Sequence, residues 1–160
     1  MQKQPFVRKR LGVVFAIASL FIGWFVIRLG NECSSPISLR GPLQNELSDC
    51  PNSPNCVSSS ASRTANHVDP LVLRSDSSDA MAQLEDIVNK LAGSKIVLSD
   101  GLYLHAEFKS RLFGFVDDLE ILIDEDQKLI FVRSASRVGY SDLGTNLNRV
   151  QKIRQCFEAL

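Results

Sequence analysis

The chain has 160 residues, of which 44% are hydrophobic and 22% are charged, a composition typical of a globular protein with room for one domain and an appendage. It holds 18 basic and 18 acidic residues, but five of the basic ones and none of the acidic ones lie in residues 1–30. Residues 31–160 therefore carry 13 basic and 18 acidic residues, a net charge of −5, which excludes the basic surface typical of nucleic-acid binding. No nucleic-acid partner is predicted.

The first predicted element is a transmembrane helix over residues 11–30. Residues 11–27, LGVVFAIASLFIGWFVI, contain no charge. At about 1.5 Å per residue they extend roughly 26 Å, close to the thickness of the bilayer's hydrocarbon core. Arg28 can snorkel to the headgroups, which brings the segment to a full span. Charged residues, among them Arg28 and Glu32, occupy the region where a signal-peptide cleavage site would lie, so an uncleaved anchor is expected.

Basic residues predict the orientation of this anchor. Four of them lie in the tail 1–10, whereas only two follow the apolar run within a short distance. The positive-inside rule then places the tail in the cytoplasm and residues 31–160 across the membrane, in the periplasm if the cell is Gram-negative. We expect a linker rich in Ser, Pro, Gly and Asn over 31–48, and an extracytoplasmic domain over 49–160.

Hydrophobic periodicity predicts an α+β domain. Residues 79–92 and 145–158 repeat apolar residues at helical spacing. The strand candidates between these two helices are joined by short connections, which imply that neighbouring strands pair antiparallel. The predicted fold is an antiparallel sheet of about four to five strands with two helices packed on one face, preceded by one N-terminal transmembrane helix. The strand candidates are 95–99, 102–111, 115–124 and 128–134, and residues 71–73 add at most a short strand.

The run LYLHAEFKSR, residues 102–111, divides cleanly between two faces of the sheet. One face is apolar and is expected to pack against the helices. We expect the other face to be solvated or to line a groove. It carries Tyr103, His105, Glu107, Lys109 and Arg111.

The loop CPNSPNC, Cys50 to Cys56, supports three interpretations. In an oxidising compartment its two prolines could hold the cysteines within bonding reach, so a Cys50–Cys56 disulfide is the first. A zinc site is less favoured, because structural zinc sites usually show closer cysteine pairs or a second pair, and no metal is predicted. A nucleophilic cysteine with His67 or His105 as its base is the third.

Asp117 and Asp118, in the run FVDDLEILID, point to opposite faces of a strand, so one of them lies on the packing face. Asp117 could end the apolar stripe at the sheet edge or pair with an arginine. Asp118 could join cross-strand ion pairs with Lys109 and Arg111. The alternative gives one of the two carboxylates the role of a general acid/base or a cation ligand.

Residues 133–142, RSASRVGYSD, are the predicted binding segment. Two arginines and several hydroxyl groups precede a helix N-terminus, and together they could hold a phosphate or a carboxylate. Alternatively, the arginines pair internally with nearby aspartates. The candidate binding residues are Arg133, Ser134, Ser136, Arg137, Tyr140, Ser141, Asp142, Asp117 and Asp118.

Three runs, CPNSPNCVSS, FGFVDDLEILID and FVRSASRVGYSDLGTNLNRVQKIRQCF, resemble the signatures of the domain-of-unknown-function 1499 family of bacteria and plants. The resemblance covers roughly Cys50 to Phe157. It implies no activity that can be transferred to this chain. Members of the family often follow an N-terminal hydrophobic segment, which agrees with the predicted anchor.

The leading hypothesis is a membrane-anchored envelope protein whose domain is a non-catalytic binding or interaction module. Its partners would be the membrane, through residues 11–30, and a protein or a small anionic ligand, and no cofactor is predicted. The sequence holds no recognisable catalytic set.

The rival hypothesis is an envelope hydrolase or transferase acting on an anionic substrate. Arg133 and Arg137 would bind the anion, and Asp117 or Asp118 would be the acid/base group. It requires Asp118, His105 and Arg137 to converge in one concave pocket.

A thiol–disulfide protein is the third hypothesis, and the C-x5-C spacing does not favour it. The states of the other two cysteines, Cys33 and Cys156, stay open. Cys156, on the last predicted helix, is most simply a small buried hydrophobe.

Overall fold

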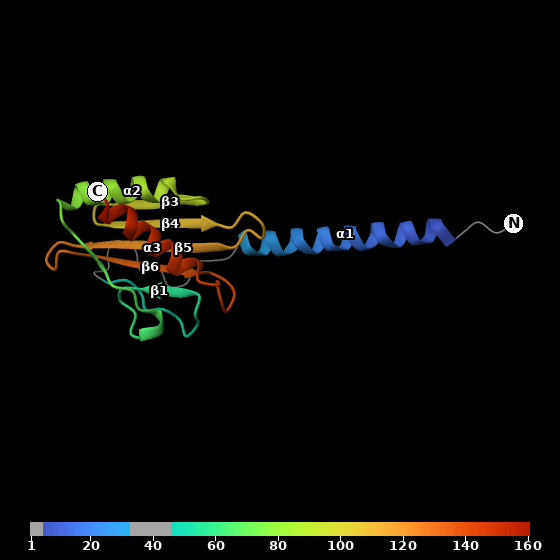
Figure 1. Cartoon of the computed structure of the whole chain (residues 1–160), viewed down its shortest axis with the longest axis horizontal. Coiled ribbons are helices and arrows are strands. Elements are labelled where there is room, and N and C mark those ends of the chain that lie inside the picture. The colour runs from blue at the N-terminus through green and yellow to red at the C-terminus, as the bar shows by residue number, and fades with distance from the viewer. Residues whose placement is uncertain (1–4, 33–45) are drawn as a thin grey trace.

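The computed structural model describes residues 5–32 and 46–160, with side chains over 13–31 and 46–160. Cys33 and most of the predicted linker lie outside these residues. Figure 1 shows an α+β domain with one long helix, α1 (Pro5–Glu32), extending from one end. The segment Val13–Asn31 of α1 is long and apolar enough to cross a membrane, and the domain does not bury it.

The sheet is antiparallel, as predicted, but it has six strands, where four to five were expected. Its order is β1-β6-β5-β4-β3, and β2 also pairs with β6. The sequence did not indicate β1, because three residues in a serine-rich segment show no alternation. The strands are β1 (Cys56–Ser58), β2 (Leu71–Val72), β3 (Ser94–Asp100), β4 (Tyr103–Lys109), β5 (Val116–Asp124) and β6 (Leu129–Ser136).

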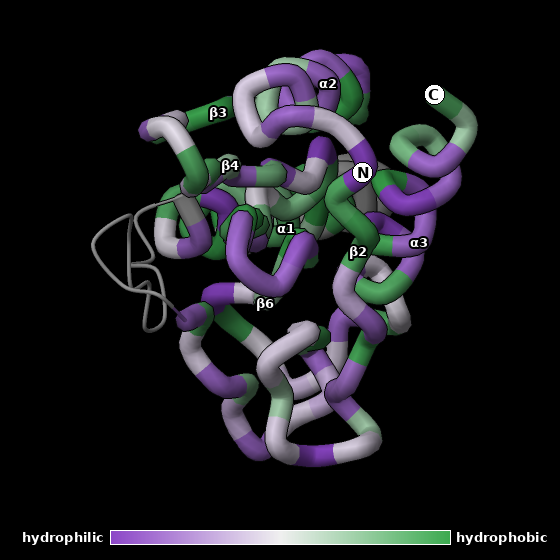
Figure 2. The backbone as a smooth tube through the Cα atoms, turned by 90° about the vertical axis from the view of Figure 1, so that its left-hand side faces the viewer, coloured by the Kyte–Doolittle hydropathy of each residue, from purple (hydrophilic) through white to green (hydrophobic). Residues whose placement is uncertain are grey.

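Helices α2 (Ser77–Lys90) and α3 (Thr145–Glu158) cover one face of this sheet, and with α1 they make three α-helices in the described chain. A short 3-10 helix spans Thr64–Asn66. The core between helices and sheet is apolar, and each aliphatic side chain fully buried in it stabilises the fold by about 1.5–3 kcal/mol. Figure 2 shows that the loops below β6, in contrast, are mostly hydrophilic. Fully buried members of the core include Leu84, Leu104, Leu119, Ile121 and Ile153.

The opposite face of the sheet, here called the polar face, is buried over the first part of β4, which corrects the expectation there, whereas Lys109 and Arg111 are exposed. Tyr103 and His105 are both buried there. Leu47 packs on this face against Tyr103, Leu122 and Phe131. Polar residues on one face of a strand predict exposure to solvent only if no other segment covers that face. Here Leu47 covers it, and Leu47 belongs to residues 31–48, which were predicted to be a linker.

Three connections lie at the end of the domain where α1 joins it: the β4–β5 loop (110–115), the β6–α3 loop (137–144) and the loop closed by Cys50 and Cys56 (Figure 1). The C-terminus and the β5–β6 turn lie at the other end.

Candidate functional site

Strand β5 is buried on both faces, with eight of its nine residues buried. Alternate residues point to opposite faces, so Leu119 and Ile121 enter the apolar core while Asp118 and Glu120 enter the polar face. Two carboxylates are thus placed in the interior, where an ion is costly unless paired and hydrogen-bonded.

Glu120 is held by two partners on the neighbouring strands. The Tyr103 hydroxyl donates to its Oε1 at 2.8 Å, and Arg133 Nη1 donates to its Oε2 at 3.0 Å. Glu120 is 0% and Arg133 1% exposed. The candidate anion-binding residue Arg133 therefore forms a buried ion pair across β5 and β6.

Asp118 is the centre of a second cluster on the same face. Arg137 donates hydrogen bonds to both carboxylate oxygens of Asp118, from Nη2 to Oδ1 at 2.7 Å and from Nε to Oδ2 at 2.8 Å. It also donates to Glu107. His105 Nε2 lies 2.8 Å from Asp118 Oδ1. Asp118, His105 and Arg137 thus lie together, which meets one part of what the enzyme hypothesis requires, but none of them lines the cavities described below. Of the three side chains, His105 is the most exposed, at 9%.

Burial alone would raise the pKa of Asp118, but the hydrogen bonds from Arg137 and His105 outweigh it and leave that pKa below its usual value. The hydrogen bond to Asp118 likewise raises the pKa of Arg137, against the opposing effect of burial. Both groups are therefore ionised at neutral pH. An incoming anion would have to displace the Asp118 and Glu107 carboxylates to reach Arg137.

Asp117 lies on the helix-covered face, where Arg149 of α3 pairs with it at 2.7 Å. The guanidinium of Arg149 also lies over the Phe108 ring, 4.2 Å from its centroid, and donates to the Ser134 hydroxyl at 2.8 Å. This is the arginine pairing that the sequence suggested for Asp117, with a partner that it did not identify.

Asn146, fully buried at the start of α3, connects the helix to two other segments. Its amide nitrogen donates to the carbonyl of Asn55 and to the Ser136 hydroxyl, each at 3.0 Å. Its oxygen accepts from the Ser134 hydroxyl at 2.7 Å. Sequence reasoning missed Asn146 because its partner Asn55 is 91 residues away, in a loop with no periodicity.

A small cavity of about 150 Å³, here called the loop pocket, lies between the β4–β5 and β6–α3 loops. Its lining includes Asp117, Ser136 and Phe115. Asp142 in its lining lies two residues before Gly144, the N-cap of α3, and its carboxylate accepts from the backbone N–H groups of Gly144 at 3.0 Å and Asn146 at 2.7 Å.

The predicted binding residues divide among four places. Arg133, Arg137 and Asp118 lie in the buried clusters of the polar face, and Ser134 lies beneath α3 with Asn146 and Arg149. Tyr140 is exposed, beside a second small cavity near the cysteine loop. Those that line the loop pocket are Asp117, Ser136, Ser141 and Asp142.

The cysteine loop is closed by the predicted disulfide, with the Cα atoms of Cys50 and Cys56 5.7 Å apart. Asn55 within it donates from its side chain to the carbonyl of Gly139 at 2.7 Å, so the loop is fastened to the β6–α3 loop. Asp49, just before it, is exposed, and hydrogen bonds from the Ser62 hydroxyl and backbone lower its pKa. Among the described residues, no three His, Cys, Asp or Glu side chains gather closely enough to hold a metal ion.

These features define a class: an α+β domain with an antiparallel sheet whose strand β5 is buried on both faces, joined to one long apolar helix. The family model described as "protein of unknown function (DUF1499)" matches residues 46–157, and the chain belongs to this family. The match begins next to Leu47, the residue that packs on the polar face. No curated protein and no solved structure matches the chain.

Proposed function

We propose that this protein is anchored in the membrane of a cell envelope by α1, and that its domain is a non-catalytic binding module on the extracytoplasmic side. The observation that carries the proposal is the loop pocket, which gathers Asp117, Ser136, Ser141 and Asp142 between two loops. The arginines that could serve a substrate anion are instead held by carboxylates inside the domain.

The membrane part of the proposal is supported by α1 and by the loop that follows it. Val13–Asn31 meets the length and apolarity of a span, and the basic residues of tail 1–10 favour a cytoplasmic N-terminus. The Cys50–Cys56 disulfide is a bond that persists in oxidising compartments outside the cytoplasm.

The size and lining of the loop pocket favour a protein partner over a small anionic ligand. Pockets for drug-sized molecules measure about 300–1,000 Å³, whereas this one measures about 150 Å³, room for one inserted side chain. Two carboxylates, Asp117 and Asp142, line it together with hydroxyl groups, and its described lining holds no Lys or Arg, so it offers acceptors to a hydrogen-bond donor rather than a cation to an anion. We therefore assign it to a polar or basic side chain of a partner protein.

Photo-crosslinking in living cells tests this assignment. Benzoylphenylalanine in place of Tyr140, which is exposed and adjacent to Ser141, should give a discrete protein adduct. The same group in place of Asp126, exposed at the far end of the domain, should give none. Ser141→Phe, which fills the pocket, should abolish the Tyr140 adduct. An adduct that survives Ser141→Phe unchanged, or that fails to form, contradicts the proposal.

A second candidate, an envelope hydrolase or transferase acting on an anionic substrate, is favoured by the convergence of His105, Asp118 and Arg137. In this version Asp118 would be the acid/base group and Arg137 the anion-binding group. Purified full-length protein should then turn over chromogenic phosphate or carboxylate esters, and Asp118→Asn should remove the turnover while the domain stays folded. If the parent protein shows no turnover and Asp118→Asn only unfolds the domain, the result supports the binding module instead.

A further inference from the structure

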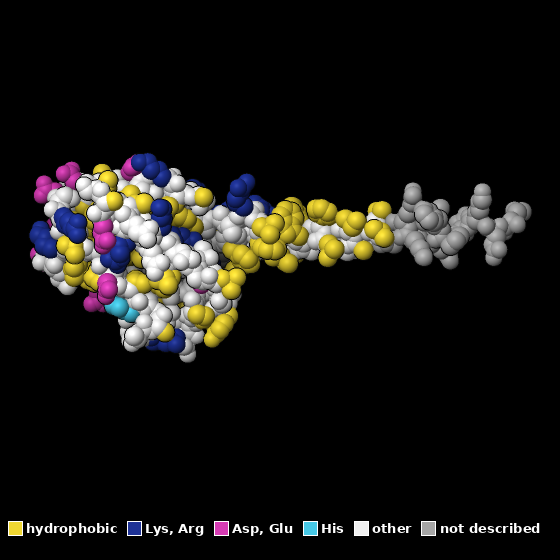
Figure 3. Space-filling model, viewed as in Figure 1, with side chains coloured by type: hydrophobic (Ala, Val, Ile, Leu, Met, Phe, Trp, Pro, Cys, Tyr) yellow, Lys and Arg dark blue, Asp and Glu magenta, His cyan; other side chains and the backbone are white. Residues whose placement is uncertain are grey.

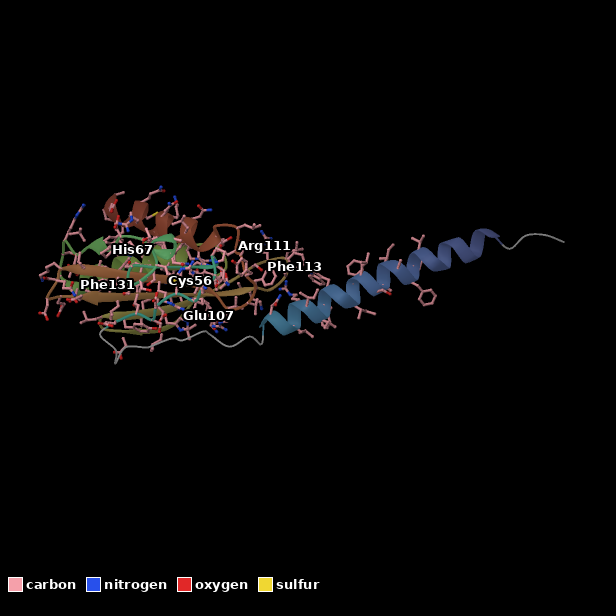
Figure 4. All side chains as sticks on the ribbon, turned by 90° about the horizontal axis from the view of Figure 1, so that it is seen from below. Cys56, His67, Glu107, Arg111, Phe113 and Phe131 are labelled. Carbon is pink, nitrogen blue, oxygen red and sulfur yellow. A yellow bond between two sulfur atoms is a disulfide. The ribbon has the colours of Figure 1, made fainter. Side chains whose placement is uncertain are left out.

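The β4–β5 loop is hydrogen-bonded along the last turns of α1. Three side chains spaced four and three residues apart, and therefore on one face of the helix, donate to three successive carbonyl groups of the loop. Figure 4 shows two of these loop residues, Arg111 and Phe113, beside the end of α1. The pairs are Trp24 with Leu112 (2.8 Å), Arg28 with Arg111 (2.8 Å) and Asn31 with Phe113 (3.0 Å).

The same loop exposes its apolar side chains. Leu112 is 61% exposed, and the rings of Phe113 and Phe115 lie 5.8 Å apart and are 39% and 40% exposed. In Figure 3 apolar side chains gather where α1 meets the domain. Exposed apolar groups that cluster in this way mark an interaction surface.

An apolar groove lies between this loop and α1, and its position along α1 indicates the environment of the loop. The groove measures about 340 Å³, and its described lining is Leu112 together with Leu20, Phe21 and Trp24 of α1. Leu20 lies eight residues before Arg28, roughly 12 Å along the helix axis. If Arg28 reaches the headgroups, Leu20 and Phe21 lie within the hydrocarbon, and so does the Leu112 side chain that faces them.

A second loop at the same end of the domain has a similar character. The β6–α3 loop projects toward the α1 side of the domain in Figure 1. Its Leu143 is 93% exposed and has a φ of 54°, a left-handed conformation that a leucine rarely adopts, and Tyr140 is also exposed. Outliers of this kind concentrate at functional sites.

We infer that these two loops form a membrane-docking surface, made of Leu112, Phe113, Phe115 and Leu143, which inserts into the leaflet from which α1 emerges. The partner is the phospholipid bilayer itself: acyl chains receive the apolar side chains, and Arg111 lies at the level of anionic headgroups. The inference rests on the proposed membrane anchoring by α1, because residues of α1 form the other wall of the groove.

The experiment measures the depth of single tryptophans in full-length protein reconstituted into phosphatidylglycerol and phosphatidylcholine vesicles with brominated acyl chains. Trp24, the one tryptophan of the chain, reports in the parent protein whether α1 lies in the bilayer. In a Trp24→Phe background, Leu112→Trp, Phe113→Trp and Leu143→Trp report on the two loops. Leu160→Trp, exposed at the opposite end of the domain, is the control.

The bromine atoms should quench the introduced indoles of Leu112→Trp and Phe113→Trp nearly as strongly as they quench Trp24. The loss of fluorescence should be weaker for Leu143→Trp and absent for Leu160→Trp. An intact disulfide and an unchanged unfolding transition establish that each variant is folded.

Two different failures can be told apart. If Trp24 is quenched while Leu112→Trp and Phe113→Trp respond like Leu160→Trp, the docking surface is wrong and the anchor stands. If Trp24 itself escapes quenching, the anchoring proposal fails, and the docking inference fails with it. Blue-shifted but unquenched emission from Leu112→Trp would overturn the inference in favour of a protein contact.

Discussion

At Asp118, hydrogen-bond donors from β4 and from the residue after β6 converge on one buried carboxylate. The arrangement is bidentate on the Arg137 side, the geometry in which a guanidinium binds a carboxylate most strongly. Among the described residues, the titratable groups beside Asp118 include His105, Glu107 and Arg137. Its lowered pKa ties the stability of the domain to pH.

Acid should destabilise the domain through Asp118. Its folded-state pKa lies below the ordinary value of 3.8, so the stabilisation is fully present above pH 3.8 and is lost as the pH falls through the folded-state pKa. Urea unfolding of the full chain in detergent micelles, followed by far-UV circular dichroism from pH 7 down to acid, measures this dependence.

The variant Asp118→Asn should lower the free energy of unfolding at pH 7 by about 3 kcal/mol, because it leaves Arg137 buried with one carboxylate fewer. It should also flatten the loss of stability in acid. Asp126→Asn, in the exposed β5–β6 turn, is the matched control and should behave like the parent chain. An acid dependence identical in Asp118→Asn and the parent would assign the effect to other carboxylates.

At the scale of elements, α3 is fastened to the sheet by polar contacts as well as by its apolar stripe. Val150, Ile153 and Phe157 pack into the core, and Asn146 and Arg149 bind polar groups at its first turns. The loop pocket lies beside this end of the helix, so its shape depends on how α3 is seated.

Asn146→Ala should lower the free energy of unfolding by about 2–3 kcal/mol, because the Asn55 carbonyl and two serine hydroxyls lose their buried partner. Asn148→Ala, the same change at an exposed position of the same helix, should cost far less. Thermal and urea unfolding of the two variants side by side provide the comparison. Equal losses would mean that helix propensity, rather than the Asn146 contacts, is what the substitutions remove.

The disulfide should contribute about 2 kcal/mol, since it closes a short loop and constrains the unfolded chain only modestly. Cys56→Ser should show this loss, and non-reducing peptide mapping of the parent protein should recover Cys50 joined to Cys56. Cys156→Ser provides the control, as its free thiol is half-buried on α3. Recovery of two free thiols at positions 50 and 56 from native membranes would contradict both the bond and the oxidising compartment.

The helices and the central strands could be predicted from the sequence because each has a hydrophobic pattern within its own residues. Residues 102–111 and 115–124 alternate, and both domain helices carry apolar stripes at helical spacing. The disulfide followed from two cysteines within one short, proline-containing loop.

The organisation of the site could not be predicted in the same way, because it depends on contacts between distant segments. Nothing near Tyr103 or His105 in the sequence says that Leu47 covers their face. Asp118 and Arg137 were both singled out, but their pairing depends on the register of β5 on β6, in which Asp118 faces Ala135. The residues around Arg149 in the sequence did not indicate that its side chain would pair with Asp117.

At the scale of the whole molecule, α1 and the C-terminus lie at opposite ends (Figure 1). The loop pocket shares Phe115 with the docking surface, so a partner that reaches the pocket would do so close to the bilayer. The distal end, with the C-terminus and the β5–β6 turn, stays available for reporters.

Alkaline phosphatase fused after Leu160 should be active, because that enzyme needs disulfides that form outside the cytoplasm. A fluorescent protein that matures only in the cytoplasm should be dark at the same position. Replacing the four basic residues of tail 1–10 by glutamine should reduce the phosphatase activity, since the charge bias that orients α1 would be lost. Bright fluorescence from the parent fusion would reverse the proposed orientation.

The two-sided burial of β5 also has a consequence for how the chain finds its fold. If β5 slipped by one residue against its neighbours, every side chain would change face: Asp118 and Glu120 would enter the aliphatic layer, and Leu119 would meet Arg133. Burying two unpaired carboxylates would cost several kcal/mol each, comparable with the roughly 5–15 kcal/mol that separates a folded domain from its unfolded chain. The interior charges therefore disfavour misaligned registers of β5, and this effect does not depend on any ligand.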